Sequence, residues 1–169
     1  MKRIHIIGGK NHGKTTLVAD LVQELSSRGY RVGTIKHTHH QHELDSPGKD
    51  SHRHRESGAA VVGILSRTMS AVFWSPESAA GSSSDDRYAT FEQSFVGCHF
   101  IIVEGDTRTA APKIEVWRKS LGTNPLAMIN TSIIAVVTHD DCPGLTATVW
   151  SRADIAMLAE KVVEIAAAL

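Results

Sequence analysis

The sequence predicts an α/β fold: a three-layer sandwich in which helices cover a mostly parallel central sheet with an antiparallel extension. Two observations predict it. Short apolar runs, typical of buried strands, alternate along the chain with segments whose apolar residues recur at helical spacing. The first strand, at 2–7, and the first helix, at 15–28, also enclose a glycine-rich turn, an order that is typical of P-loop NTPases.

The remaining elements follow from the same periodicities. The predicted strands are 2–7, 31–36, 61–66, 70–74, 100–103, 114–117 and 133–137. The predicted helices are 15–28, 50–57, 86–96 and 152–168. The apolar runs at 100–103 and 133–137 are continuous, which is typical of parallel strands buried on both faces. A short turn separates 61–66 from 70–74, so we expect an antiparallel pair there.

Length and composition set broad limits. The chain has 169 residues, so we predict a single nucleotide-binding domain over 1–169, with a flexible Ser- and Gly-rich loop at 75–86. Lys plus Arg and Asp plus Glu each number 18, and this balance argues against a nucleic-acid or membrane partner. Cys98 and Cys142 form no disulfide framework, and no signal peptide or apolar membrane span is evident. We therefore expect a cytoplasmic protein.

The glycine-rich turn, from Gly8 to Thr15, is a complete Gly-x4-Gly-Lys-Thr motif. Its glycines let the backbone curl so that N–H groups point at an anion, and the following helix adds partial positive charge. Lys14 is expected to act catalytically on the β- and γ-phosphates, and Thr15 to bind Mg²⁺. A flexible loop without a ligand is the alternative. The predicted nucleotide contacts here are Gly9, Lys10, Asn11, His12, Gly13, Lys14, Thr15 and Thr16.

Glu104 follows the buried strand at 100–103, at the carboxyl end where ligands bind in open α/β sheets. A carboxylate at this position is placed to hold the P-loop Mg²⁺, directly or through water, so we predict a metal-binding and catalytic role. Alternatively, Glu104 is solvated or paired with Arg108. Gly105 keeps side-chain bulk away from the γ-phosphate, and Asp106 is a weaker candidate.

The segment Thr138-His139-Asp140-Asp141 follows the apolar run at 133–137. It is similar to the Thr-Lys-x-Asp pattern of GTP-binding proteins, with His139 in place of the lysine. A carboxylate at Asp141 could select guanine, because adenine offers no matching donors and would leave the acid unpaired. We therefore predict that Thr138 and Asp141 contact the nucleotide. An ordinary acidic turn is an equal alternative.

Six of the ten histidines fall between His37 and His54, interleaved with Lys and Arg. Three interpretations compete: a transition-metal site, a surface for phosphate or a pterin, and a solvated loop without a ligand. The second is favoured over a metal site because no cysteine and no fixed ligand spacing accompany the histidines. The predicted ligand contacts are Lys36, His37, His39 and His40. Asp50 is expected either to orient the attacking water as a catalytic residue or to cap the helical residues that follow it at 51–57.

Six short motifs together resemble the MobB family of molybdopterin-guanine dinucleotide biosynthesis adaptors. They are Gly-Lys-Thr-Thr-Leu at 13–17, Ile-Lys-His-Thr-His-His at 35–40, Pro-Gly-Lys-Asp-Ser at 47–51, Ser-Gly-Ala at 57–59, Val-Glu-Gly at 103–105 and Pro-Lys-Ile at 112–114. The resemblance implies a P-loop homodimer that binds GTP and Mg²⁺ and has weak GTPase activity. It also implies that the protein assists the nucleotidyltransferase that joins GMP to molybdopterin.

The chain departs from the family pattern in two places. Asp106, Thr107 and Arg108 follow Val-Glu-Gly where relatives commonly have an aromatic residue and Lys. Lys10 also lies one position past the first of the two P-loop lysines that some relatives carry, so no role across a dimer is assigned to it. Two functions of other classes remain as alternatives: a metallochaperone GTPase that uses the histidines, and a small-molecule kinase.

Overall fold

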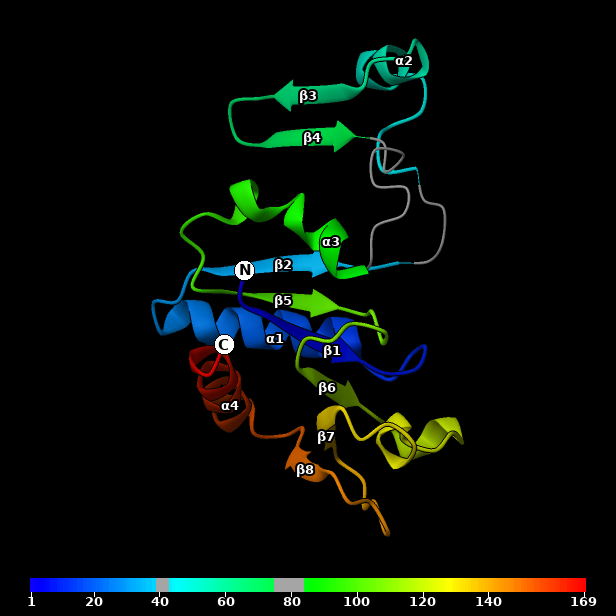
Figure 1. The fold of residues 1–169 in the computed structure, drawn as a ribbon, viewed down its shortest axis with the longest axis vertical. Helices are drawn as coiled ribbons and strands as arrows, with labels where there is room; N and C mark the ends of the chain where they lie inside the picture. Colours follow the sequence, from blue (N-terminus) through cyan, green and yellow to red (C-terminus); the bar gives the residue numbers. More distant parts are fainter. Residues whose placement is uncertain (39–42, 75–83) are drawn as a thin grey trace. The chain divides into compact units, whose positions relative to one another are not determined.

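The computed structural model describes residues 1–38, 43–74 and 84–169 (Figure 1). The chain divides into two compact units. The first, here called the sheet unit, comprises 1–38 and 88–169, and the second, the hairpin unit, comprises 39–87. Each unit is described by itself.

A parallel sheet forms the centre of the sheet unit. Its strands are β1 (Arg3–Ile7), β2 (Val32–Lys36), β5 (Phe100–Glu104), β6 (Lys113–Val116), β7 (Ile133–Thr138) and β8 (Thr148–Ser151). They lie in the order β2-β5-β1-β6-β7-β8, and every neighbouring pair is parallel. Their carboxyl ends therefore meet at one edge, with β1 between β5 and β6.

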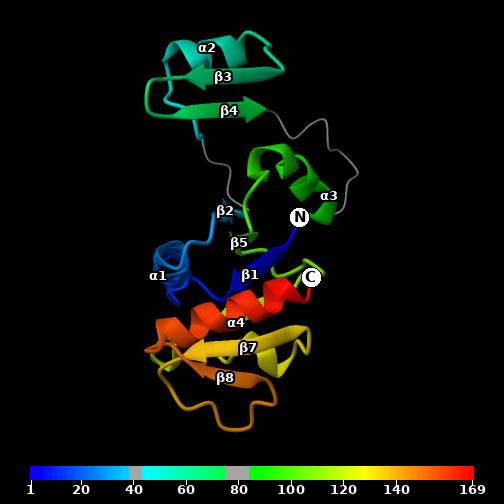
Figure 2. The same ribbon diagram turned by 90° about the vertical axis from the view of Figure 1, so that its left-hand side faces the viewer.

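Two helices cover one face of this sheet. α1 (Lys14–Ser27) and α4 (Ile155–Ala167) lie side by side and share an apolar core with Ile4, Ile6 and Ile102 (Figure 2). On the other face, Ile101 and Val103 pack against Tyr88 and Phe95. Two short segments supply these contacts: α3 (Ser84–Ala89) and the 3₁₀ helix η2 (Glu92–Phe95). Two further 3₁₀ helices, η3 (Lys119–Leu121) and η4 (Leu126–Met128), lie between β6 and β7 in the chain. The predicted three-layer arrangement around a parallel sheet is confirmed.

One helix and two strands lie wholly within the described part of the hairpin unit. α2 is Asp50–Glu56, β3 is Val61–Leu65 and β4 is Ser70–Trp74. β3 and β4 pair antiparallel, with Val61 opposite Trp74 and Leu65 opposite Ser70. The predicted antiparallel extension is thus present, as a separate two-stranded sheet.

Three predicted segments differ from the structure. The predicted helix at 86–96 is divided into α3 and η2, because Phe91 and Ser94 donate to carbonyls three residues earlier, which tightens the chain into 3₁₀ turns. The last helix begins at Ile155 and not at 152, since the Asp154 side chain accepts from Met157 N and caps it. β8 was not predicted.

Other predictions are left open by the described residues. The loop predicted at 75–86 lies outside them over 75–83, and α3 begins at Ser84. The single-domain organisation over 1–169 stays a prediction. Among the described helices, none combines the length and the apolar composition that a membrane crossing needs.

Candidate functional site

The glycine-rich loop joins β1 to α1 at the carboxyl edge of the sheet. Gly8 and Gly13 have φ angles of 141° and 98°, in the region that favours glycine, and Asn11 also has a positive φ of 66°. A Cβ at Gly8 would lie 2.3 Å from the carbonyl oxygen of Val116, so the loop packs directly on β6. Gly13 is the N-cap of α1 and has no side chain with which to cap it. The first N–H groups of α1 are therefore left for another acceptor.

The Lys14 ammonium lies over the loop that precedes it. Nζ donates to the carbonyl oxygens of Gly8, at 3.0 Å, and Gly9, at 2.7 Å. Burial lowers the pKa of Lys14 and Lys36 lowers it further, whereas Glu104 acts in the opposite direction. The contacts to two neutral carbonyls hold the charged group in the concave part of the loop, where an anion would meet it.

Thr15 and Glu104 are brought together as predicted. Thr15 Oγ1 donates to Glu104 Oε1 at 2.8 Å, and Lys36 Nζ is 3.9 Å from the same oxygen. β2 and β5 cause this convergence, because Lys36 and Glu104 are register partners at their ends. Adjacent oxygen ligands of an octahedral Mg²⁺, at roughly 2.0–2.1 Å from the metal, lie roughly 2.9 Å apart. The separation of the two oxygens therefore fits two neighbouring positions around Mg²⁺.

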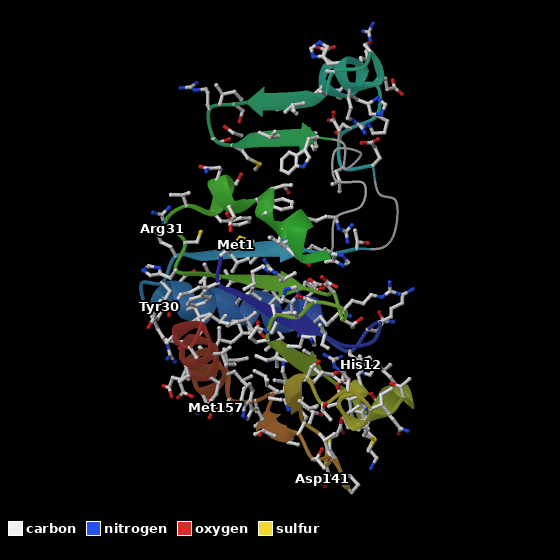
Figure 3. The ribbon with its side chains drawn as sticks, in the orientation of Figure 1. Met1, His12, Tyr30, Arg31, Asp141 and Met157 are labelled. Carbon is white, nitrogen blue, oxygen red and sulfur yellow. The ribbon has the colours of Figure 1, made fainter. Side chains whose placement is uncertain are left out.

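His12 has a structural role within the loop (Figure 3). Its side chain is buried, Nδ1 accepts from the backbone N of Arg118 at 3.0 Å, and Nε2 lies 3.2 Å from Thr123 Oγ1. Burial lowers the pKa of His12, and the nearby charges of Lys14 and Arg118 lower it further. Through these two contacts the neutral imidazole links the glycine-rich loop to the segment 118–123. Its predicted nucleotide contact can come only from the backbone.

On the other side of the loop, the end of β7 lies next to a small pocket. Asp140 Oδ2 accepts from Lys119 N at 2.8 Å, and Asp140 N donates to Thr138 Oγ1 at 3.0 Å. The side chains of Thr138 and Asp140 are therefore engaged in hydrogen bonds with backbone N–H groups. Asp141 instead lines a pocket of about 300 Å³ together with Trp117 and Lys119.

A buried polar cluster supports the residues after Glu104. Tyr88 donates its hydroxyl to Asp106 Oδ2 at 3.0 Å, and both residues are buried. Burial alone would raise the pKa of Asp106, but the Tyr88 hydrogen bond, the nearby His37 ring and the Arg108 N–H outweigh it and lower the pKa. A Cβ at Gly105 would lie 2.8 Å from the His37 carbonyl oxygen. Asp106 and His37 therefore fix the backbone that presents Glu104.

The structure does not bring every predicted residue to this edge. His39 and His40 lie outside the described residues. Lys10, Asn11 and Thr16 are exposed on the loop and the first turn of α1. Asp50 belongs to the hairpin unit, where it is the first residue of α2. Its predicted capping alternative is wrong, because the N-cap is Lys49 and no side-chain cap hydrogen bond is present.

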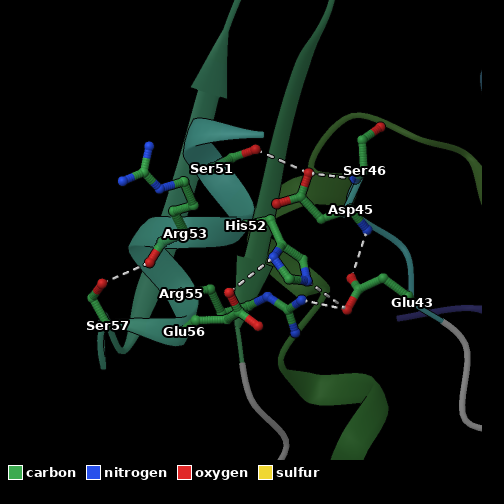
Figure 4. Close-up of polar contacts among 9 residues, drawn as sticks. All are labelled: Glu43, Asp45, Ser46, Ser51, His52, Arg53, Arg55, Glu56 and Ser57. Carbon is green, nitrogen blue, oxygen red and sulfur yellow. Dashed lines mark hydrogen bonds and ion pairs between the residues drawn. The ribbon is translucent and has the colours of Figure 1, made fainter. Parts of the chain in front are cut away.

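Polar contacts join α2 to the segment that precedes it (Figure 4). Asp45 is buried, and its Oδ1 accepts from Ser46 N and Ser51 Oγ. Arg55 pairs with Glu43 at 2.5 Å, and His52 lies 3.4 Å from the same carboxylate. Within the described parts of the chain, no three His, Cys, Asp or Glu side chains converge as a metal site would require. The His52 ring is therefore engaged in local contacts with acidic side chains.

Sequence reasoning missed several residues of the site. They are Tyr88, Trp117, Arg118, Lys119 and Thr123. A signal existed for Arg118 and Lys119, because basic residues that follow a buried strand lie at the ligand-binding edge of a parallel sheet. No such sequence signal existed for Tyr88, because its hydrogen bond to Asp106 depends on how the chain returns from α3 to the sheet.

The parallel sheet, the glycine-rich loop opening α1 and the Thr15–Glu104 pair define a nucleotide-binding protein of the P-loop class. A family model described as molybdopterin guanine dinucleotide synthesis protein B matches residues 3–139. The chain belongs to this family, MobB, and the resemblance noted in the sequence is confirmed.

Individual relatives agree with the family match. The chain is 32% identical over 152 residues to the molybdopterin-guanine dinucleotide biosynthesis adapter protein of Escherichia coli K12, covering 90% of this chain and 86% of that one. It is 34% identical over 134 residues to the adapter protein of the same name from Haemophilus influenzae, covering 79% and 72%.

Solved structures show the same fold. A crystal structure titled molybdopterin-guanine biosynthesis protein B has a TM-score of 0.70 at 23% identity and covers 97% of this chain and 98% of its own. A structure of Bacillus subtilis MobB has a TM-score of 0.69 at 17% identity, with 98% and 97% covered.

Proposed function

We propose that this protein is a GTP-binding adapter in the biosynthesis of molybdopterin-guanine dinucleotide, with weak Mg²⁺-dependent GTPase activity. The contact between Thr15 and Glu104 beneath the P-loop carries the proposal. It joins the hydroxyl and the carboxylate that a triphosphate-bound Mg²⁺ needs in a chain of the MobB family. The family relationship supports the adapter role, because its relatives carry that name.

The residues of this edge have distinct tasks in the proposed reaction. The N–H groups that open α1 and the Lys14 ammonium bind the β- and γ-phosphates, and Thr15 and Glu104 hold Mg²⁺. When bound, Mg²⁺ neutralises charge that develops on the phosphate oxygens. Lys36, 3.9 Å from Glu104 Oε1, adds a cation on the side of the terminal phosphate. The role of Asp50 in orienting the attacking water stays a prediction.

The pocket beside Asp141 supports guanine as the base. Its volume of about 300 Å³ and its lining by Trp117, Lys119 and Asp141 combine an aromatic face with a carboxylate. The carboxylate would accept from N1–H and the 2-amino group of guanine. We therefore expect wild-type protein to prefer GTP over ITP, which lacks the 2-amino group, and Asp141→Asn to remove that preference.

Titration calorimetry with GTP, GDP, ITP and ATP in the presence of Mg²⁺ tests the proposal. We expect binding of GTP, and a loss of about tenfold to a hundredfold or more in Lys14→Ala, because charge-assisted hydrogen bonds to phosphate disappear. Lys161→Ala is the matched control, since Lys161 is paired with Glu164 on α4. Preference for ATP, or unchanged GTP binding in Lys14→Ala, would contradict the proposal.

The partners proposed for this adapter are the molybdopterin nucleotidyltransferase, with molybdopterin as a further ligand, and a second copy of the chain. The hairpin supports the homodimer. Val61, Leu65 and Val72 lie on one face of β3 and β4, with 60%, 90% and 54% of their surface exposed. Apolar surface of this kind marks protein interfaces.

Analytical ultracentrifugation tests the homodimer. Wild-type protein should sediment as a dimer, and Leu65→Asp should shift it to the monomer. Ile129→Asp is the control, because Ile129 is equally exposed, at 88%, but lies in the sheet unit. A monomeric wild type, or a dimer that persists in Leu65→Asp, would exclude this face as the dimer interface.

A further inference from the structure

Arg118 is attached to the P-loop through its backbone and its side chain. It follows β6, the neighbour of β1, and its backbone N donates to His12 Nδ1 at 3.0 Å. A Cβ at Gly13 would lie 2.6 Å from Arg118 Nη2 and 3.1 Å from Cζ. The guanidinium therefore lies directly on the backbone of Gly13, where α1 begins.

No acidic side chain in the described part of the chain pairs with the Arg118 guanidinium. The ion pairs of the sheet unit join other residues, and the carboxylate of Glu104 already contacts Thr15 and Lys36. His12 adds no charge, because burial, Lys14 and Arg118 all lower its pKa. Lys14 and Arg118 thus place two cations at the start of α1, an arrangement that an anion would stabilise.

The order of the strands indicates where along a bound nucleotide the Arg118 guanidinium would lie. β5, with Glu104, lies on one side of β1, and β6 and β7, which lead to Arg118 and Asp141, lie on the other. A nucleotide whose metal-bound phosphate is at Glu104 and whose base is at Asp141 passes Arg118 between its two ends. In that arrangement the guanidinium would lie next to the phosphates nearer the ribose.

We propose that Arg118 is a further phosphate-binding residue, which contacts the α- and β-phosphates of the guanine nucleotide from the β6 side of the P-loop. This inference rests on the proposed function. It distinguishes Arg118 from Lys36, which lies beside Glu104 at the end that holds the γ-phosphate. Arg118 should therefore stabilise GDP and GTP alike, whereas Lys36 should stabilise mainly GTP.

The test measures Kd values of GTP and GDP, with Mg²⁺, for wild type, Arg118→Gln, Arg118→Lys and Lys36→Gln. We expect Arg118→Gln to weaken GTP and GDP by a similar factor of about tenfold to a hundredfold, because charge-assisted hydrogen bonds to phosphate are lost. Arg118→Lys should recover part of this loss, since it keeps the charge but not the forked geometry. Lys36→Gln should weaken GTP more than GDP.

Arg31→Gln is the matched control. Arg31 also lies over a glycine with positive φ, Gly97, where a Cβ would be 3.1 Å from Nη1, but it precedes β2 at the opposite edge of the sheet. This variant should bind both nucleotides like wild type. Thermal unfolding of all variants checks that the fold is kept.

Two outcomes would overturn the inference while wild type still binds GTP. One is unchanged or tighter binding in Arg118→Gln, as expected of a side chain that obstructs the loop. The other is a loss confined to GTP, which would place the guanidinium at the γ-phosphate. Absence of guanine-nucleotide binding in wild type would instead refute the proposed function itself, and this inference with it.

Discussion

The sheet unit and the hairpin unit differ in how they bury apolar side chains. In the sheet unit, Ile4, Ile6 and Ile102 are completely buried between the sheet and two helices. In the described residues of the hairpin unit, Val62 is the single buried apolar side chain, and Leu65 is 90% exposed. Burial of apolar surface is the dominant stabilising contribution to folding. The sheet unit therefore has a core of its own that can hold a site rigidly.

The hairpin unit depends on other interactions. Two-stranded sheets are at best marginally stable in water, and this one is supported by contacts with α2. Asp45, buried before α2, bonds Ser46 and Ser51. The exposed face of β3 and β4 is the surface that a partner could cover. The proposed nucleotide site thus lies in the unit with the larger core, and the proposed dimer surface in the other.

Ile102→Ala should produce the largest effect on stability. Its side chain is fully buried in the interior strand β5, and removal of buried methylene groups leaves a cavity. The free energy of unfolding should fall by about 2–5 kcal/mol, as measured by urea denaturation. A loss below about 1 kcal/mol would mean that the sheet unit is not the rigid part of the molecule.

Tyr88→Phe should destabilise by about 1–3 kcal/mol at pH 7, because Asp106 loses a buried hydrogen-bond donor. The effect should depend on pH. The folded-state pKa of Asp106 is below its ordinary value of 3.8, so its charged form contributes stability above that pH. This contribution is lost as the pH falls through the folded-state pKa. The difference between variant and wild type, followed by urea denaturation, should therefore shrink below pH 4, roughly; a constant difference would exclude a charged Asp106.

Ser51→Ala should have a smaller effect, confined to the hairpin unit. It removes one hydrogen bond to the buried Asp45, worth about 0.5–1.5 kcal/mol. Amide hydrogen exchange should accelerate in α2 and remain unchanged in α1. Ser57→Ala is the control, because its hydroxyl bonds the Arg53 carbonyl on an exposed turn. Faster exchange throughout the sheet unit would show that the two units unfold together.

Leu65→Ala should have the smallest effect on dilute protein, within about 0.5 kcal/mol of wild type, because the side chain is already in solvent. Measurements at higher protein concentration test whether the exposed face of the hairpin forms a dimer. If this face forms a dimer, the melting temperature of wild type rises with protein concentration, and that of Leu65→Asp does not. An unchanged concentration dependence in Leu65→Asp would remove the hairpin from the interface.

The P-loop edge was predictable because local rules determine it. The glycine spacing requires the positive φ angles seen at Gly8 and Gly13. Glu104 could be placed near Thr15 because the ends of parallel strands meet at the same edge. Both features follow from a short stretch of sequence and one rule of sheet topology.

Other parts depend on contacts between distant residues and could not be predicted. β8, Thr148–Ser151, has four residues and only one partly buried position, and it becomes a strand through its pairing with β7. Arg118 reaches Gly13 because β6 lies next to β1, although more than a hundred positions separate β6 from the start of the chain. His12 was expected at the ligand. The packing of the 118–123 segment on the loop instead buries its ring.

The buried imidazole of His12 should affect how fast a ligand binds to the glycine-rich loop. Its contacts to Arg118 and Thr123 hold the loop in its curled shape through the protein's own bonds. An incoming ligand then has little chain entropy to remove, and its association rate should be governed by diffusion and orientation more than by a slow rearrangement of the loop.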